Sequence, residues 1–269
     1  MTDPWQLKLD RARQHLQQLE TEIGAYAARH PYAAVRGPRR QRDHVPNTRR
    51  YVVEITEQPD PMWGVMVGEF FFDLRSALDN IVVACAPAKR SRSAGFPIAT
   101  EDLWAKDEAG SFVNRDNQLR TSLDGRLAGL DAALITVVKE LQPYRRRPGF
   151  VQLDPLAIIS RFDNLNKHRG LIVTAGAIYD TATTVTVRDD VIKQDAWGLR
   201  EAGAEVAYFG LDPTIPESEV QVEISGTATV TLDIAGRERE YFEVPNALAG
   251  IPDYVATAVL AELEPFVRR

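Results

Sequence analysis

Two short polar segments combine the residue types that phosphate binding and acid–base chemistry use. Residues 73–80 read DLRSALDN, and residues 163–169 read DNLNKHR. An arginine guanidinium is a permanently charged fork that can bind a phosphate through two hydrogen bonds. Histidine titrates near neutral pH and can therefore donate or accept a proton. These two segments are the candidates for a functional site.

The spacing within each segment also allows a purely structural interpretation. Arg75 and Asp79 are four residues apart, and so are Asp163 and Lys167. Each pair can therefore form an ion pair on one face of its own helix. Polar groups buried beside an apolar helix face must find such partners. The alternative to a functional site is a polar network that holds two helices together.

The two segments lie on predicted helices. The first belongs to a helix over residues 63–85, whose apolar face comprises Val67, Phe70, Phe71, Leu74, Leu78, Ile81 and Cys85. The second lies at the end of a helix that begins after Asp154, a good N-cap followed by Pro155, and ends at Gly170. We expect the longer helix to be central to the fold.

Other helices are predicted near both ends of the chain. One apolar stripe with alternating spacings of three and four residues comprises Trp5, Leu9, Ala12, Leu16, Leu19, Ile23 and Tyr26. Packing within the chain is favoured over a coiled-coil dimer, because Ala12 and Tyr26 are poor seam residues. Further helices are expected over residues 101–107, 124–141 and 247–267, the last with Ile251, Val255, Val259, Leu263 and Phe266 inward.

The hydrophobic period changes from 3.6 to 2 after Gly170. Strands are expected at residues 171–174, 183–187, 206–209, 220–224, 230–234 and 240–242, with a tight turn at Ala235 and Gly236. Before this region, residues 30–48 are predicted to form a loop and residues 51–56 a strand. The fold class is therefore α+β, with a helical domain over residues 1–170 and an antiparallel meander with a closing helix over residues 171–269.

Composition excludes several classes of protein. The chain has 269 residues, of which 44% are hydrophobic and 26% charged, so it can form a core. No apolar stretch approaches the about 20 residues that a membrane-spanning helix needs. The single cysteine, Cys85, excludes an internal disulfide, and the four histidines share no metal-ligand spacing. We expect a cytoplasmic protein without a metal or other cofactor.

Basic residues are concentrated in the first part of the chain. Residues 1–150 contain 22 Lys and Arg against 19 Asp and Glu, whereas residues 151–269 contain 10 against 19. Nucleic-acid phosphates are the expected partner of such a basic face. The candidate contacts are Arg36, Arg39, Arg40, Arg42, Arg145, Arg146, Arg147, Lys167 and Arg169. The alternative is a set of solvated loops, since few aromatic residues lie nearby.

Four segments together resemble a group of uncharacterised bacterial and phage proteins. These are GEFFFDLRSALDN at residues 68–80, FPI at 96–98, LQPY at 141–144 and NLNKHR at 164–169. The resemblance extends over most of residues 1–170 and supports the fold more than a function. In that group, the position that matches Asn80 is commonly His.

Residues 75–80 are also similar to the motif of HEPN-type helical proteins, an arginine followed after four to six residues by a histidine. Many HEPN-type proteins are metal-independent ribonucleases that act as dimers, so the resemblance implies HEPN-like helix packing, an RNA or phosphate ligand and a homodimer. Asn80 departs from the motif, because asparagine cannot act as a general acid or base. On an ideal helix, Arg75 and Asn80 also lie about 140° apart.

The expected function is therefore HEPN-like binding of RNA or another phosphate ligand, with weak or absent ribonuclease activity. The candidate catalytic residues are Arg75, Asp79, Asn80 and His168. Arg75 would stabilise negative charge, and His168 would supply the proton transfer that Asn80 cannot. The alternative function is that of a non-enzymatic interaction or scaffold protein, such as one of phage origin.

Overall fold

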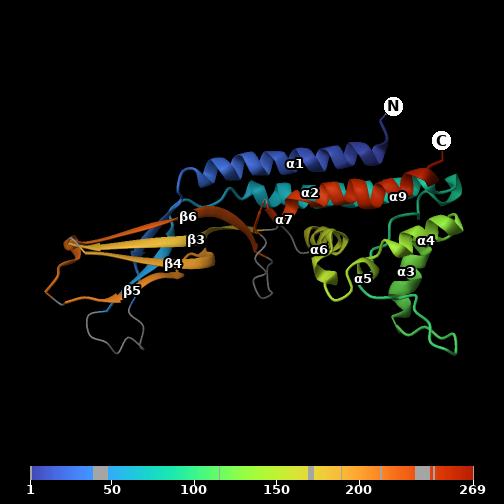
Figure 1. Ribbon diagram of the computed structural model, residues 1–269. Coiled ribbons are helices and arrows are strands. Elements are labelled where there is room, and N and C mark those ends of the chain that lie inside the picture. The colour runs from blue at the N-terminus through green and yellow to red at the C-terminus, as the bar shows by residue number, and fades with distance from the viewer. Residues whose placement is uncertain are drawn as a thin grey trace. The chain divides into compact units, whose positions relative to one another are not determined.

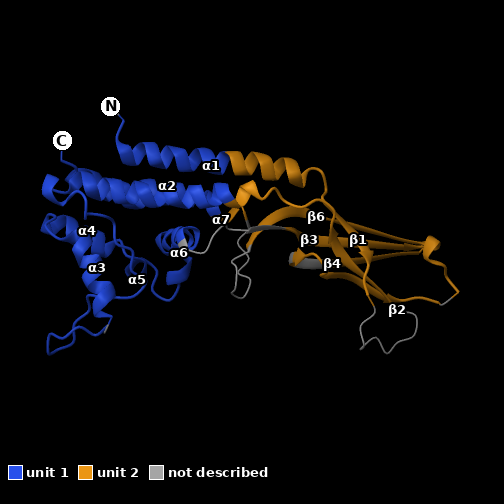
Figure 2. Ribbon diagram, turned by 180° about the vertical axis from the view of Figure 1, so that it is seen from behind, with its two compact units in different colours: residues 1–17, 65–172, 248–269 blue, residues 18–64, 173–247 orange. Residues whose placement is uncertain are grey.

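The computed structural model describes residues 2–38, 48–114, 116–168, 173–188, 190–212, 214–233, 243–244 and 246–268. It confirms the α+β class, with helices, antiparallel sheets and a C-terminal helix (Figure 1). The chain forms two compact units (Figure 2), unit 1 from residues 1–17, 65–172 and 248–269, and unit 2 from residues 18–64 and 173–247. The predicted domain end at residue 170 lies beside the change of unit after residue 172, whereas residues 18–64 group with the sheets.

Helix α1 (Pro4–Ala27) confirms the predicted apolar stripe. All seven stripe residues are buried, and the most exposed of them, Leu16, is only 8% exposed. The part of α1 up to Gln17 belongs to unit 1 and the rest to unit 2. In the described part of the chain, no helix is both long and apolar enough to cross a bilayer.

Helix α2 (Met62–Cys85) contributes much of the core of unit 1. Its residue Phe71 stacks on Phe162 of helix α6 (Pro155–His168), with ring centroids 4.7 Å apart. Asp154 begins α6 as predicted, because its Oδ1 accepts a hydrogen bond from the backbone N–H of Leu156 over 2.9 Å. Both helices that carry the polar segments are thus confirmed and packed together.

Shorter helices complete this part of unit 1, namely α3 (Asn117–Leu127), α4 (Ala132–Glu140), α5 (Pro143–Arg146) and the 3₁₀ turns η1 (Ala88–Arg90) and η2 (Val151–Leu153). The predicted helix over residues 124–141 is interrupted, because Gly129 has a φ of 79° and Asp131 caps α4 through the N–H of Ala133. The helix predicted over residues 101–107 is wrong. There, Asp102 Oδ1 accepts the N–H groups of Trp104 and Ala105 in a turn.

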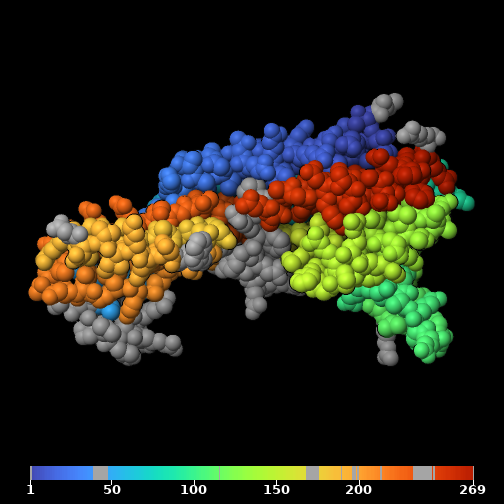
Figure 3. Space-filling view, viewed as in Figure 1, coloured from blue at the N-terminus to red at the C-terminus, as the bar shows by residue number. Residues whose placement is uncertain are grey.

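The predicted C-terminal helix is present but irregular. It comprises α7 (Asn246–Ala249), α8 (Ile251–Tyr254), a π-helical stretch η4 (Val255–Leu260), α9 (Ala261–Leu263) and the 3₁₀ turn η5 (Glu264–Phe266). Figure 3 shows this segment in red, between α1 and the helices α4–α6. Arg13 pairs with Asp253 at 3.0 Å, and Arg146 donates to the carbonyl of Ala258 over 3.0 Å. The segment therefore contacts both α1 and α5 within unit 1.

Unit 2 contains two antiparallel sheets. One has β1 (Tyr32–Arg36), β2 (Thr48–Ile55) and β5 (Glu205–Gly210) in the order β1-β2-β5. The other has the order β4-β3-β6-β7, formed by β4 (Asp190–Glu201), β3 (Val173–Val187), β6 (Val220–Asp233) and β7 (Glu243–Val244), and the 3₁₀ turn η3 (Glu217–Glu219) precedes β6. Both sheets contribute to one core, which includes Tyr32, Tyr51, Val53, Ile178, Val185, Val206 and Phe209.

Within the described residues, the predicted strands were too short, and β1, β4 and the two-residue β7 were missed. Residues 30–48 contain β1 rather than only a loop, and β4 had no counterpart among the predicted strands. Four of the predicted strands are, as far as they are described, parts of the two long strands β3 and β6. They are residues 171–174, 183–187, 220–224 and 230–234. Gly176 lies within β3 where a Cβ would lie 2.7 Å from Tyr26 Oη, so glycine there allows close packing. The strand expected at 240–242 and the turn at 235–236 lie outside the described residues.

Candidate functional site

The two polar segments predicted from the sequence meet at one pocket of unit 1, which has a volume of about 280 Å³. Helix α2 contributes two lining residues, α6 contributes four, α3 contributes four, and the loop after η1 contributes one. They are Arg75, Asp79, Ser160, Asp163, Asn164, Lys167, Leu119, Ser122, Leu123, Arg126 and Ile98. The pocket is thus lined by polar and charged side chains with an apolar patch.

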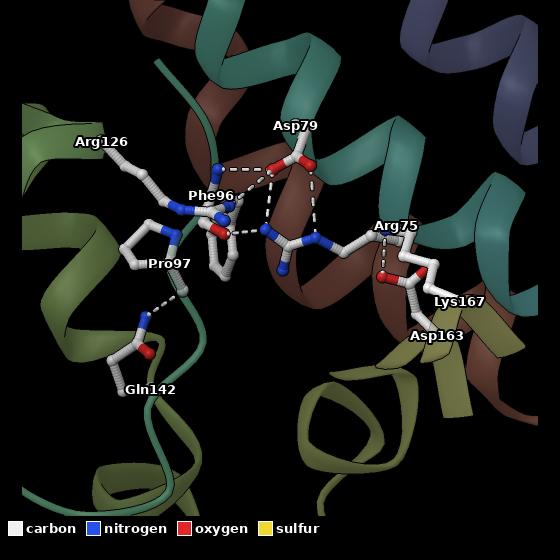
Figure 4. A network of polar contacts seen from close by, with 8 residues as sticks. All are labelled: Arg75, Asp79, Phe96, Pro97, Arg126, Gln142, Asp163 and Lys167. Atoms are coloured by element: carbon white, nitrogen blue, oxygen red, sulfur yellow. Dashed lines mark hydrogen bonds and ion pairs between the residues drawn. The ribbon is translucent and has the colours of Figure 1, made fainter. Parts of the chain in front are cut away.

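Arg75 is buried at the base of this arrangement (Figure 4). Its Nε donates to Asp79 Oδ2 over 3.2 Å, and its Nη2 donates to Asp79 Oδ1 over 2.8 Å and to the carbonyl of Phe96 over 2.5 Å. Burial lowers the pKa of Arg75, an effect that the charge of Asp79 opposes. The remaining nitrogen, Nη1, makes no hydrogen bond among the described residues, so Arg75 keeps donors for a ligand.

Asp79 connects three groups at the edge of the pocket. Besides Arg75, its Oδ1 accepts the backbone N–H of Phe96 over 2.8 Å and lies 3.9 Å from Arg126 Nη1. A Cβ at Gly95 would lie 3.0 Å from that same oxygen, so glycine there lets the chain approach the carboxylate closely. Arg126 is 42% exposed at its side chain, and within the described residues its contact with a carboxylate is this long one. Its charge is therefore largely available to a ligand.

Asp163 and Lys167 form the opposite wall. Lys167 Nζ donates to Asp163 Oδ2 over 2.7 Å, and the lysine side chain remains 45% exposed. The other carboxylate oxygen, Asp163 Oδ1, is buried and has no hydrogen-bond partner in the described part of the chain. A buried acceptor without a donor is costly. A ligand that offers a hydroxyl or N–H group near Asp163 would reduce that cost.

The charges of the pocket favour an anionic group. Arg75, Arg126 and Lys167 face two carboxylates, those of Asp79 and Asp163. The cations exceed the anions by one, and the serine, asparagine and apolar side chains add no charge. Within the described residues, no group of three or more His, Cys, Asp and Glu side chains could hold a metal ion. The three cations are groups through which this pocket can attract an anion.

Buried polar contacts support the pocket from behind. Gln142 is fully buried, and its Nε2 donates to the carbonyls of Pro97 (3.1 Å) and Val138 (2.7 Å) while its Oε1 accepts the N–H of Ala99 (2.7 Å). A Cβ at Gly68 would lie 2.7 Å from Asn166 Oδ1, so α2 and α6 approach closely there. Hydrogen bonds therefore join the segments at 68–80, 96–98 and 141–144, and the segment at 164–168 packs closely against the first of them.

The structure brings some of the predicted catalytic residues together. Arg75 and Asp79 line the pocket with Lys167, whereas Asn80, partly buried on α2, is not among the lining residues. His168 is the last residue of α6, and its side chain lies outside what the structure describes. Of the predicted nucleic-acid contacts, Arg39, Arg40, Arg42 and Arg169 also lie outside the described residues.

The remaining predicted basic contacts have partners away from the pocket. Arg145 pairs with Glu140 at 3.4 Å, and Arg147 donates to the carbonyl of Leu153 over 3.4 Å. Arg146 lies over the ring of Tyr254 as well as donating to Ala258. In unit 2, Arg36 forms an ion pair with Glu217. These four arginines therefore make contacts within the chain, and the predicted contact with nucleic acid stays a prediction.

Sequence reasoning missed the contribution of α3. Arg126, Ser122 and Leu123 lie on this helix and reach the pocket. The prediction placed a helix over residues 124–141, so Arg126 was on a helix but Ser122 and Leu123 were not. The region has no strong apolar periodicity and no motif, and its role depends on the tertiary packing of α3 beside α2 and α6. No signal in the sequence could have assigned these residues to the site.

Comparison of the chain with models of known protein families, with curated proteins and with solved structures finds no match. The resemblance to the bacterial and phage group and to HEPN-type proteins therefore stays a prediction. The chemistry of the pocket carries the functional argument.

Proposed function

We propose that the pocket binds a phosphate group, either of a free nucleotide or of RNA, in a HEPN-like manner. The observation that carries this proposal is the convergence of Arg75, Arg126 and Lys167, from three different helices, on one pocket of about 280 Å³. This volume lies just below the range of about 300–1,000 Å³ that is typical of ligand pockets. It suits a phosphate with its attached sugar rather than a large ligand.

The buried guanidinium gives the proposed site its anchor. Asp79 and the Phe96 carbonyl hold Arg75 in one orientation, so binding a phosphate to Nη1 requires little additional ordering of this side chain. Arg126 and Lys167 are both partly exposed and can move onto the ligand. Ser122 and Asn164 add neutral donors. Charge-assisted hydrogen bonds from three cations are the interactions that bind phosphates most strongly.

A structural role is the competing function. The bond from Arg75 to the Phe96 carbonyl and the burial of Gln142 favour a network that holds the helices together. The protein would then be a non-enzymatic interaction or scaffold protein. Such a network does not require Arg126 and Lys167 to be exposed. Both side chains are partly exposed at the pocket, which favours the binding of a phosphate over a purely structural role.

The test is the affinity of the purified protein for uridine 5′-monophosphate and for a short 5′-phosphorylated uridylate RNA, each measured at low and moderate salt. We expect affinity to fall with salt. We expect Arg126→Gln to weaken binding by about tenfold, the loss of one hydrogen bond to a charged group. The matched control is Arg92→Gln, at an exposed arginine outside the pocket. Equal affinities of the two variants would contradict the proposal. The two ligands distinguish a nucleotide site from an RNA site.

The proposed activity towards RNA is weak or absent cleavage, because Asn80 cannot transfer a proton. The same RNA, analysed for its length after incubation, reports this directly. RNA that wild type cleaves and His168→Ala does not would assign metal-independent ribonuclease chemistry, with Arg75 stabilising the developing charge. A homodimer is also part of the HEPN-like proposal, and sedimentation of the purified protein tests it.

A further inference from the structure

Phe72 is a large exposed aromatic side chain beside the pocket. It follows the buried Phe71 on α2, and its own residue surface is 44% exposed. Two ammonium groups lie at its ring: Lys8 Nζ of α1 is 5.2 Å from the ring centroid, and Lys167 Nζ of α6 is 5.8 Å from it. An exposed ring with two ammonium groups within about 6 Å is chemically unlike an isolated apolar residue.

Lys167 belongs both to the pocket and to the surroundings of the Phe72 ring. It lines the pocket and forms the ion pair with Asp163, and its ammonium group also lies over Phe72. Phe72 and Arg75 are three residues apart on α2, so they lie on neighbouring positions of one helix face. Lys167 therefore connects the ring with the proposed phosphate site.

Each of the two lysines beside Phe72 is held by a carboxylate, and the one that holds Lys167 also lines the pocket. Lys8 Nζ donates to the buried Asp73 over 2.6 Å while it lies beside the ring. Lys167 is held by Asp163. Two positioned cations next to one exposed ring can attract the phosphates on either side of a stacked base.

We infer that Phe72 is a stacking site for an unpaired nucleobase whose phosphate lies in the pocket of Arg75, Arg126 and Lys167. This inference rests on the proposed function and narrows its ligand to a nucleotide unit with an accessible base. Stacking on an aromatic side chain tolerates any base, because every base has a π face. The site would therefore favour single-stranded over double-stranded nucleic acid, in which both faces of a base are already stacked.

The test compares two 5′-phosphorylated RNAs that differ only at the first position, where one has uracil and the other has an abasic ribose. We expect wild type to bind the uracil RNA at least about fivefold more tightly than the abasic RNA. Phe72→Leu keeps an apolar side chain but removes the ring. We expect it to lose this preference while binding the abasic RNA as wild type does.

The matched control is Phe150→Leu, at a phenylalanine that is 67% exposed and does not line the pocket. It should keep the preference for the uracil RNA. If Phe72→Leu keeps the preference, or weakens both RNAs equally, the inference is overturned. If Arg126→Gln still weakens binding in that case, the phosphate site stands without base stacking. If wild type binds neither these RNAs nor uridine 5′-monophosphate, both proposals fail.

Discussion

Arg75 donates a hydrogen bond over 2.5 Å to the backbone carbonyl of Phe96, and so ties helix α2 to the segment that follows η1. The same guanidinium pairs with Asp79, which also accepts the N–H of Phe96. Arg75 and Asp79 thus bind the carbonyl and the N–H group of Phe96, respectively. This closed arrangement fixes the direction of the guanidinium towards the pocket, so the fold and the proposed site depend on one side chain.

Removal of the Arg75 charge is expected to destabilise the protein. In Arg75→Gln, the partly buried Asp79 loses its main cationic partner and the Phe96 carbonyl loses its donor. Breaking a buried pair in this way typically costs about 3 kcal/mol or more of the free energy of unfolding. Urea denaturation measures the change. Arg126→Gln is the control, expected to cost less than about 1 kcal/mol because its ion pair is long and exposed. Equal costs for the two variants would contradict the role assigned to Arg75.

Gly68 and Asn166 are expected to be energetically coupled. Replacing an interior helix glycine by alanine generally stabilises by up to about 1 kcal/mol. At Gly68 the new methyl group would lie 2.7 Å from Asn166 Oδ1, so this gain should be lost as the amide is displaced. In an Asn166→Ala background the gain should return. The free energy of unfolding of the two single variants and the double variant gives the coupling.

Gly24 provides the matched control for that cycle. It lies in α1, and a Cβ at this position would meet nothing within 4 Å. We therefore expect Gly24→Ala to stabilise the protein in either background. A Gly68→Ala variant as stable as Gly24→Ala would show that α2 and α6 do not approach as closely as the structure places them.

The long helices could be predicted because burial dictates their sequences directly. In α1, each stripe residue from Trp5 to Tyr26 is buried, and the 3.6-residue period follows from that single requirement. The strands were harder to predict, since Gly176 and Gly226 interrupt the pattern although both lie within continuous strands. A Cβ at Gly226 would lie 2.8 Å from Ile178 Cδ1. Such close approaches depend on tertiary contacts that a local pattern does not contain.

The candidate site could be predicted only in part, because the sequence shows local pairs but not tertiary contacts. Arg75 with Asp79, and Asp163 with Lys167, are local pairs whose spacing is visible in the sequence. Arg126 comes to the pocket only because α3 packs near α2 and α6, and nothing in its own neighbourhood indicates that. The partners of Arg146 and Arg147 are backbone carbonyls, which no sequence pattern identifies.

The stability contribution of Asp154 is expected to depend on pH. Its side chain is fully buried, and burial raises the pKa of Asp154 above its usual value. Burial also raises the pKa of Tyr254 to about 12, so that its hydroxyl stays protonated and lies 3.4 Å from Asp154 Oδ2. A carboxyl with a raised pKa binds its proton more tightly in the folded state. Ionisation therefore costs stability as the pH rises through the unfolded and then the folded pKa.

Asp154→Asn removes this titration but keeps an N-cap acceptor for Leu156. Urea denaturation at several values between about pH 3 and about pH 7 should show the variant gaining stability relative to wild type as the pH rises. Other groups titrate equally in both proteins and cancel in the difference. The quantity compared is the free energy of unfolding of the variant minus that of wild type. If it is constant or falls as the pH rises, the folded protein does not hold the Asp154 proton more tightly than the unfolded chain does.

Gln142 should be essential for the segment that carries Phe96. In Gln142→Met, the side chain keeps a similar volume, but the N–H of Ala99 and the carbonyl of Pro97 lose their buried partner. Each unsatisfied buried group costs about 1–3 kcal/mol, so we expect a loss of about 3 kcal/mol in the free energy of unfolding. Gln152→Met, at an exposed glutamine of η2, should change stability by less than about 0.5 kcal/mol. Because the Phe96 carbonyl orients Arg75, Gln142→Met should also weaken nucleotide binding under conditions where it remains folded. Unchanged affinity in a destabilised but folded variant would show that the pocket does not depend on this segment.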